Sequence, residues 1–179
     1  MDDLERELAL RLQAVAGKLM CEQREEVLKA LVTTLSKAFG SNPDEVAILL
    51  LSQDRQMLLF AYPPELAQGG SNAFPVTSPS LAGHVAGTGA SLVINDMRDV
   101  QRLAFYERVP IMETAPAGIQ KLLAVAVEGA DGRPQGVVEV SRRGNSLAEV
   151  GPDFQIEDQE LLERLAATAA PAIARAFGS

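Results

Sequence analysis

The sequence predicts an α+β fold with a central antiparallel sheet. The terminal helices cover one face of this sheet, and a helix and loop segment, residues 78–120, covers the other face. Two observations support this fold. Amphipathic helical patterns lie at both ends of the 179-residue chain. Between them, apolar runs of strand length come in pairs joined by short turns, which makes neighbouring strands antiparallel.

The N-terminal residues 2–20 are predicted to form a helix, because apolar side chains recur at intervals of three and four. They are Leu4, Leu8, Leu12, Val15 and Leu19. We interpret this stripe as a dimer interface shared with Leu165 and Ala169 of the last helix, since an exposed apolar stripe needs a cover and two-fold dimers are the commonest oligomers. The alternative is a helix packed on its own domain. The chain is accordingly divided into an N-terminal dimerisation helix, residues 1–21, and a domain, residues 22–179.

The domain begins with a second helix over residues 22–39, which ends at Gly40. The apolar run 45–51 is typical of a central strand, 57–62 of the return strand of a hairpin, and 73–77 of a short edge strand, where Pro75 is tolerated. A second hairpin joins strands 121–128 and 135–141. Residues 98–120 are irregular apart from a short helix over 100–108. A loop of that length inside a compact domain is uncommon unless it is functional or mobile. The last helix begins near Ile156 or Glu157, and Pro171 predicts a kink or a break in it.

The most informative stretch is residues 80–97, SLAGHVAGTGASLVINDM. Ser80 can cap a short helix by accepting a backbone N–H, and Gly87 and Gly89 end it. Residues 92–94 then form a buried strand, and an Asn95-Asp96 turn follows. A helix N-terminus against a sheet is a common place for a small ligand, so this stretch favours a binding module over an enzyme.

The composition and the missing motifs exclude several classes of function. The net charge of -8, without a basic cluster, argues against nucleic-acid binding. Cys21 is the only cysteine, which excludes an internal disulfide and a cysteine-based zinc cluster and fits a reducing compartment. Signal peptide and membrane-span patterns are absent from the sequence, so we expect a cytoplasmic protein that binds no membrane. Phosphate-loop, dinucleotide and nucleophile-elbow motifs are missing too, and we expect no enzyme.

Four segments in this order resemble the GAF domain, a small-molecule sensing module of signalling proteins. They are residues 80–96, 121–127, 133–140 and 154–170, and the likeness covers roughly residues 24–177. The resemblance implies a central antiparallel sheet with a ligand pocket on the face opposite the terminal helices, roofed by the segment 78–120. It also implies helix-mediated homodimers.

Candidate ligand-binding residues come from the segments expected at this pocket. They are Phe74, Val76, Leu81, His84, Val85, Asn95, Asp96, Phe105, Tyr106 and Met112. For His84 the alternative is an exposed position on a short helix. For Asn95 and Asp96 it is a turn in which the side chains bond to local backbone. Phe105, Tyr106 and Met112 could equally pack as a lid over the sheet without a ligand. No metal site is expected, because a single histidine has no partners.

The resemblance also limits the cofactor. Cys21 does not match the pocket cysteine of bilin-carrying members, so no covalent bilin is expected, and the several pocket cysteines of free methionine sulfoxide reductases are missing. A cyclic nucleotide stays possible as the ligand. No motif supports it, because the Asn-Lys-Phe-Asp-Glu signature of cyclic-nucleotide-binding members is absent. We therefore expect a sensory or regulatory domain that binds an unidentified small molecule and signals through helix-mediated dimer contacts to a separate protein. The alternative is a ligand-free interaction or dimerisation module of the same fold.

Overall fold

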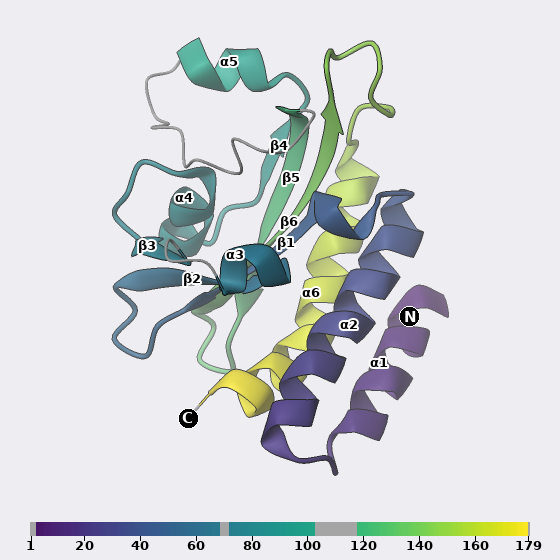
Figure 1. Ribbon diagram of the computed structural model, residues 1–179, viewed down its shortest axis with the longest axis vertical. Helices are drawn as coiled ribbons and strands as arrows, with labels where there is room; N and C mark the ends of the chain where they lie inside the picture. Colours follow the sequence, from purple (N-terminus) through teal and green to yellow (C-terminus); the bar gives the residue numbers. More distant parts are fainter. Residues whose placement is uncertain (1–2, 69–71, 103–117, 179) are drawn as a thin grey trace.

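The computed structural model describes residues 3–68, 72–102 and 118–178, and its centre is a six-stranded antiparallel sheet (Figure 1). The strand order is β3-β2-β1-β6-β5-β4. The strands are β1 (Val46–Leu51), β2 (Met57–Tyr62), β3 (Ala73–Pro75), β4 (Leu92–Ile94), β5 (Gly118–Glu128) and β6 (Pro134–Gly144). This confirms the predicted α+β class, with the 73–77 segment at an edge as expected.

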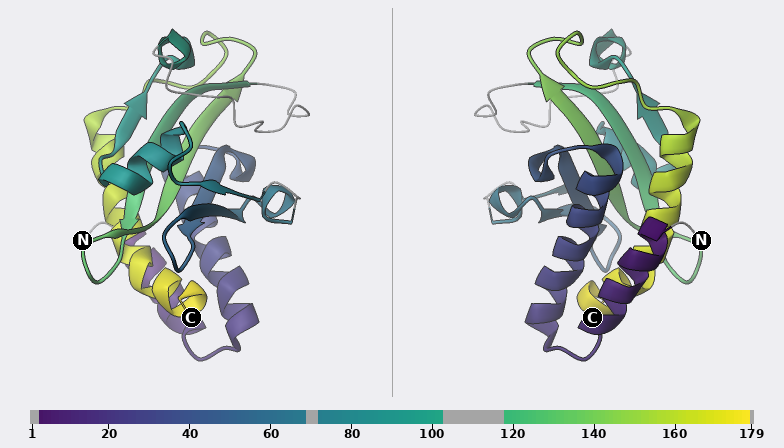
Figure 2. Two further views of the ribbon diagram at one scale, coloured as in Figure 1. Left: turned by 90° about the vertical axis from the view of Figure 1, so that its left-hand side faces the viewer. Right: turned by 90° about the vertical axis from the view of Figure 1, so that its right-hand side faces the viewer.

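Helices cover the sheet unequally on its two faces (Figure 2). The long helices α1 (Asp3–Val15), α2 (Met20–Phe39) and α6 (Ile156–Phe177) pack together on one face. The short helices are η1 (Pro43–Glu45), α3 (Pro64–Ala67), α4 (Leu81–Thr88) and α5 (Met97–Arg102), and α4 packs on the other face, against β5 and β6. The sheet therefore separates a helical layer from a second, thinner layer.

The alternation of side chains along the strands produces one hydrophobic core on each face. In the central pair, Ile48 of β1 lies opposite Val138 of β6, and both side chains belong to the core beneath the long helices. Leu49 lies opposite Val137, and both belong to the core beneath α4. The near-continuous apolar sequence of β1 follows from burial on both faces.

The N-terminal stripe packs inside its own chain. The predicted helix 2–20 ends at Val15, and α2 begins at Met20. The buried members of the stripe share a core with the last helix; they are Leu8, Leu12, Val15, Leu165 and Ala169. Leu4 is partly buried against the same core, and Leu19, outside both helices, is 70% exposed. These contacts are those of a helix packed on its own domain, and a dimer through this stripe would require α1 to leave the core, since buried side chains offer no surface to a second chain.

The last helix remains continuous through Pro171 from Ile156 to Phe177, so the predicted break is absent. Proline removes the N–H that would bond to the carbonyl four residues earlier, which favours bending. Figure 1 shows the C-terminal part of α6 turning away from the axis of its first part. The Gln135 side chain donates a hydrogen bond to the Ala170 carbonyl (3.0 Å), which links β6 to the helix beside the proline.

The helix predicted after Ser80 is confirmed as α4. The Ser80 hydroxyl accepts the Gly83 N–H (3.0 Å), and Gly89, with a φ of 73°, ends the helix in the left-handed conformation. Gly83 is also needed for packing. A Cβ atom at this position would lie 2.6 Å from the Val76 carbonyl oxygen and 3.0 Å from that of Ser78. The segment before α4 therefore presses directly on the helix backbone.

We expect Gly83→Ala to lower the free energy of unfolding by about 1–3 kcal/mol, the usual cost of overpacking against backbone that cannot move aside. Gly87→Ala is the matched control on the same helix, because a Cβ atom there meets nothing within 4 Å. Alanine in a helix is favoured over glycine by about 0.5–1 kcal/mol, so the control variant should be unchanged or slightly more stable. Urea denaturation of both variants checks this. Equal stabilities would contradict the close contact.

Candidate functional site

The sheet face beneath α4 is apolar except near its middle. Its buried core includes Leu49, Leu58, Phe60, Val85, Leu122, Ala124 and Val137. Among these residues, β6 places Glu139 on the same face as Val137, two positions earlier in the strand. An ionisable side chain in an apolar surrounding is costly unless it is paired or serves a function. Glu139 is therefore the first residue to consider for a site.

Short neighbours leave room beside Glu139. In the register of the sheet it lies between Ala47 of β1 and Ala124 of β5. Within the described part of the chain, its carboxyl group forms no hydrogen bond or ion pair. Burial raises the pKa of Glu139 from 4.5 to about 7, because the charged form loses hydration without gaining a partner. Near neutral pH the group is thus present both as an acid that can donate and as a carboxylate.

A cavity of about 20 Å³ adjoins Glu139. This volume is sufficient for about one water molecule or one polar group of similar size. Apolar side chains from the sheet and from α3 line it, among them Phe60, Leu66, Ile119 and Leu122. Ala47 also lines it, so the short side chain beside Glu139 forms part of the cavity wall.

Arg143 also lines this cavity. Its Nε atom is buried and has no hydrogen-bond partner within the residues that the structure describes. Its backbone N–H donates to one carboxylate oxygen of Glu45 (2.8 Å), and the other oxygen accepts the Asn42 N–H (2.8 Å). Glu45 is therefore occupied in holding the start of β1 to the end of β6. Among the described residues that line the cavity, the charged groups left for a ligand are those of Glu139 and Arg143.

Four of the predicted ligand-binding residues lie together on this face. Phe74, Val76, Leu81 and Val85 belong to its core or pack against it, and the Phe74 ring lies 6.0 Å from that of Phe60. His84 is exposed on α4, so its side chain faces away from the sheet, as in the alternative reading of that residue. Phe105, Tyr106 and Met112 lie outside the described residues.

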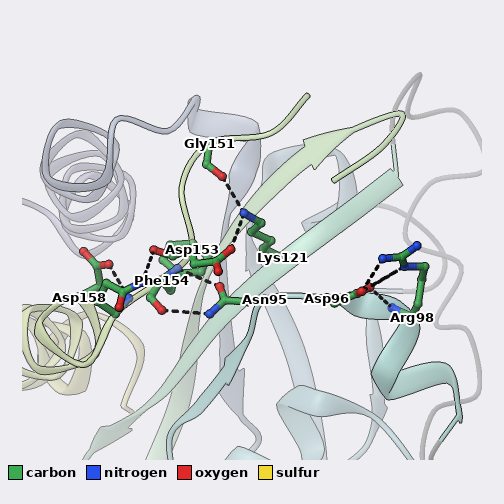
Figure 3. Close-up of polar contacts among 9 residues, drawn as sticks. Asn95, Asp96, Arg98, Lys121, Gly151, Asp153, Phe154 and Asp158 are labelled. Carbon is green, nitrogen blue, oxygen red and sulfur yellow. Dashed lines mark hydrogen bonds and ion pairs between the residues drawn. The ribbon is translucent and has the colours of Figure 1, made fainter. Parts of the chain in front are cut away.

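Asn95 and Asp96 point in different directions (Figure 3). The Asn95 amide donates to the Phe154 carbonyl (3.0 Å), and its oxygen accepts the Phe154 N–H (2.8 Å), so it joins β4 to the segment before α6. The Asp96 carboxylate pairs with Arg98 (2.6 Å) and accepts its backbone N–H (2.9 Å). None of the predicted ligand-binding residues in the described part of the chain lines the cavity beside Glu139.

A buried lysine anchors the same segment. Lys121 of β5 is 6% exposed, and its Nζ donates to the Gly151 carbonyl (2.8 Å) and to the Asp153 carboxylate (2.7 Å), as Figure 3 shows. The Arg142 guanidinium lies 4.6 Å from the centre of the Phe154 ring. The segment before α6 is therefore held by side chains from two strands. The next residue of β5, Leu122, faces the opposite side and lines the cavity.

Glu139 and Arg143 were not among the predicted site residues, although the sequence contains a signal for them. The strand GVVEVS, residues 136–141, alternates between two buried faces, and Glu139 is a charged residue at an inward-facing position. Such a residue is unusual in a strand covered on both sides. Arg143 has the same parity as Glu139 and so shares its face.

Metal-binding clusters and membrane-spanning helices are not seen in the described residues. Within these ranges, no three side chains of His, Cys, Asp or Glu come close enough to hold a metal ion. Cys21 is exposed in the first turn of α2, on the other side of the sheet from the cavity. In the part of the chain covered by the structure, no helix has both the length and the apolar character needed to cross a bilayer.

Known structures share this architecture. The GAF domain from an Acinetobacter phosphoenolpyruvate-protein phosphotransferase superposes with a TM-score of 0.68 at 19% identity, covering 100% of this chain and 99% of that one. A fragment of a methyl-accepting chemotaxis protein, residues 122 to 287, gives 0.66 at 16% identity, covering 94% and 96%. Free methionine-R-sulfoxide reductase from Neisseria meningitidis, solved with its substrate, gives 0.62 at 17% identity, covering 98% and 93%. At these identities the likeness establishes the fold alone.

The sequence comparison establishes the family. No curated protein matches the chain. The family model described as the GAF domain matches residues 21–174, which is most of the chain and includes every strand of the sheet. GAF domains are signalling and sensory domains. The match confirms the resemblance drawn from the four sequence segments, and the chain belongs to the GAF domain family.

Proposed function

We propose that this GAF domain is a sensor that binds a small molecule at the cavity beside Glu139 and Arg143. The observation that supports the proposal most strongly is the Glu139 carboxyl group, which has no partner among the described residues and lies on an apolar sheet face next to a cavity bordered by Ala47. A few polar groups converging in an apolar surrounding are typical of small-molecule sites. The proposed site lies on the face opposite α1, α2 and α6.

The proposed role is binding rather than catalysis. The methionine sulfoxide reductase neighbour shows that this fold also occurs in an enzyme. Here the single cysteine is exposed on α2 and separated from the cavity by the sheet, so it cannot supply a thiolate to a molecule bound beside Glu139. We therefore infer that binding changes the conformation of the domain and that a separate protein detects the change.

Strand β5 offers a direct route for such a change. Leu122 lines the cavity, and the adjacent Lys121 holds the segment from which α6 begins. A ligand that displaces β5 would therefore alter the position of Lys121 and of the first turn of α6. The proposed conformational change therefore reaches the helical layer, where a second copy or another protein can make contact.

Native mass spectrometry tests the proposal. We expect freshly purified protein to carry an additional mass that is lost on denaturation. Ala47→Leu should abolish that mass, because a larger side chain would fill the space beside Glu139. Ala14→Leu, at an exposed position on α1, is the matched control and should retain it. Retention of the mass by Ala47→Leu would place the ligand elsewhere, provided circular dichroism shows both variants folded.

The second candidate is an interaction module that binds no ligand. It is favoured by the small volume of the cavity and by the inward packing of Phe74 against Phe60. The surfaces it would use are the exposed apolar residues of the helical layer, which include Leu10, Leu19 and Met20. A bare mass for the purified protein, together with no thermal stabilisation by any ligand tested, would favour this candidate, since a ligand that binds the native state must stabilise it.

A further inference from the structure

The two polar groups at the cavity carry opposite charges and do not neutralise each other. Resting on the function proposed above, we infer that the ligand is a zwitterion of the amino-acid type, with its ammonium group on Glu139 and its carboxylate on Arg143. This inference specifies the chemistry of the ligand, which the fold leaves open.

Glu139 is the acceptor for the ammonium group. Its carboxyl group has no partner among the described residues and stands between two alanines, so a small polar group can approach it directly. The cavity of about 20 Å³ has the size of one water molecule, and an ammonium group needs about the same space. The ammonium group therefore fits the cavity as it stands, and the rest of the ligand needs space that the side chains around Glu139 and Arg143 must open on binding.

Arg143 is the donor for the carboxylate. Its Nε is one of four buried side-chain atoms without a hydrogen-bond partner in the described residues, and leaving such a group unpaired is costly. A guanidinium group binds a carboxylate through two parallel hydrogen bonds, and the Nε atom can supply one of them. The third charged residue at the cavity, Glu45, is already bonded to the backbone of Arg143 and Asn42.

The spacing on β6 suits a ligand with two charges a short distance apart. Glu139 and Arg143 are four residues apart on one face of a strand, which separates their Cα atoms by about 13 Å. Both side chains stand on the same face of the sheet, and the two groups form no ion pair with each other. Both groups are therefore available to opposite charges of one bound molecule.

Proton balance makes the inference testable through pH. A protonated Glu139 must release its proton to solvent when an ammonium group binds, leaving a carboxylate paired with the cation. The pKa of Glu139, raised to about 7 by burial, makes the ionised fraction rise about tenfold between about pH 6 and pH 8. The other charged groups lining the cavity are Arg143 from β6 and Glu45 from η1, while β1, β2, β5 and α3 contribute uncharged residues.

The experiment is calorimetric titration with the twenty proteinogenic L-amino acids, followed, for each one that binds, by the corresponding decarboxylated amine and N-acetyl derivative. We expect at least one amino acid to bind and both derivatives to bind at least tenfold more weakly. Affinity should increase about tenfold from about pH 6 to pH 8, and Glu139→Gln should remove this increase. Arg143→Gln should weaken the binding of the amino acid but not the binding of its decarboxylated amine. Glu128→Gln and Arg133→Gln, at exposed positions, are the matched controls.

The outcomes separate this inference from the proposed function. Equal binding of an amino acid and its amine or N-acetyl derivative would overturn the zwitterion while leaving the cavity as the ligand site. Failure of all twenty amino acids would also overturn it, and a bound mass that Ala47→Leu removes would then show that the cavity holds another compound. If that mass is absent as well, both the inference and the proposed function fail.

Discussion

Leu8→Ala is expected to lower the free energy of unfolding by about 2–5 kcal/mol, the range for truncating a fully buried leucine. Leu8 is completely buried in the core between α1, α2 and α6. Truncation removes apolar contacts and leaves a cavity that rigid helices cannot fill. Because domains of this size are stable by only about 5–15 kcal/mol, the loss is a large fraction of the total.

Leu10→Ala is the matched control, since Leu10 is on the same helix but 60% exposed. Its effect should stay within about 0.5 kcal/mol. Guanidinium denaturation at several protein concentrations measures both variants. If α1 packs on its own chain, the Leu8 effect is the same at every concentration. A loss that depends on concentration would instead support the stripe as an interface between two copies.

Glu139→Gln is expected to make the protein more stable at alkaline pH. The folded-state pKa of Glu139, about 7, is above its ordinary value of 4.5, so the folded state binds the proton more tightly than the unfolded state. The resulting stability is complete below about pH 4.5 and is lost as the pH rises through 7. Each pKa unit corresponds to about 1.4 kcal/mol, which sets an upper limit of about 3 kcal/mol on the loss for this half-buried group.

Urea denaturation from about pH 4 to pH 8 measures this effect as the difference between wild type and variant. Glutamine has nearly the same shape and no charge, so the two proteins should have similar stability at the acid end and diverge as Glu139 ionises. Glu128→Gln, at the exposed end of β5, is the control for an ordinary surface carboxyl. Parallel curves for wild type and Glu139→Gln would show that Glu139 is hydrated or paired in the folded protein.

Most of the fold could be predicted because its signals are local. The cap at Ser80, the left-handed Gly89 and the apolar run of β1 each determine a boundary or a burial pattern within a few residues. The position of α1 was harder to predict. An apolar stripe such as that of Leu8 and Leu12 demands a cover, but its period does not say whether the cover belongs to the same chain.

The site was predicted less well, for a physical reason. Asn95 and Asp96 were candidates because their side chains could orient a polar ligand, with bonding to local backbone as the alternative. In the structure the Asn95 side chain instead forms hydrogen bonds with the backbone of Phe154, a residue 59 positions away in the sequence. Glu139 stands out only when the strand is known to be buried on both faces, which depends on the packing of the whole sheet.

The central strand pair has a consequence for how the chain folds as it is synthesised. Residues of β1 pair with residues of β6 that lie between 86 and 94 positions later in the sequence. The hairpin of β1 and β2 can form early, but the other edge of β1, an almost wholly apolar strand, stays unpaired until β6 is made. Unpaired apolar edges recruit other strands, and distant pairings form slowly. The protein is therefore most exposed to aggregation during synthesis, when the N-terminal half has been made and β6 has not.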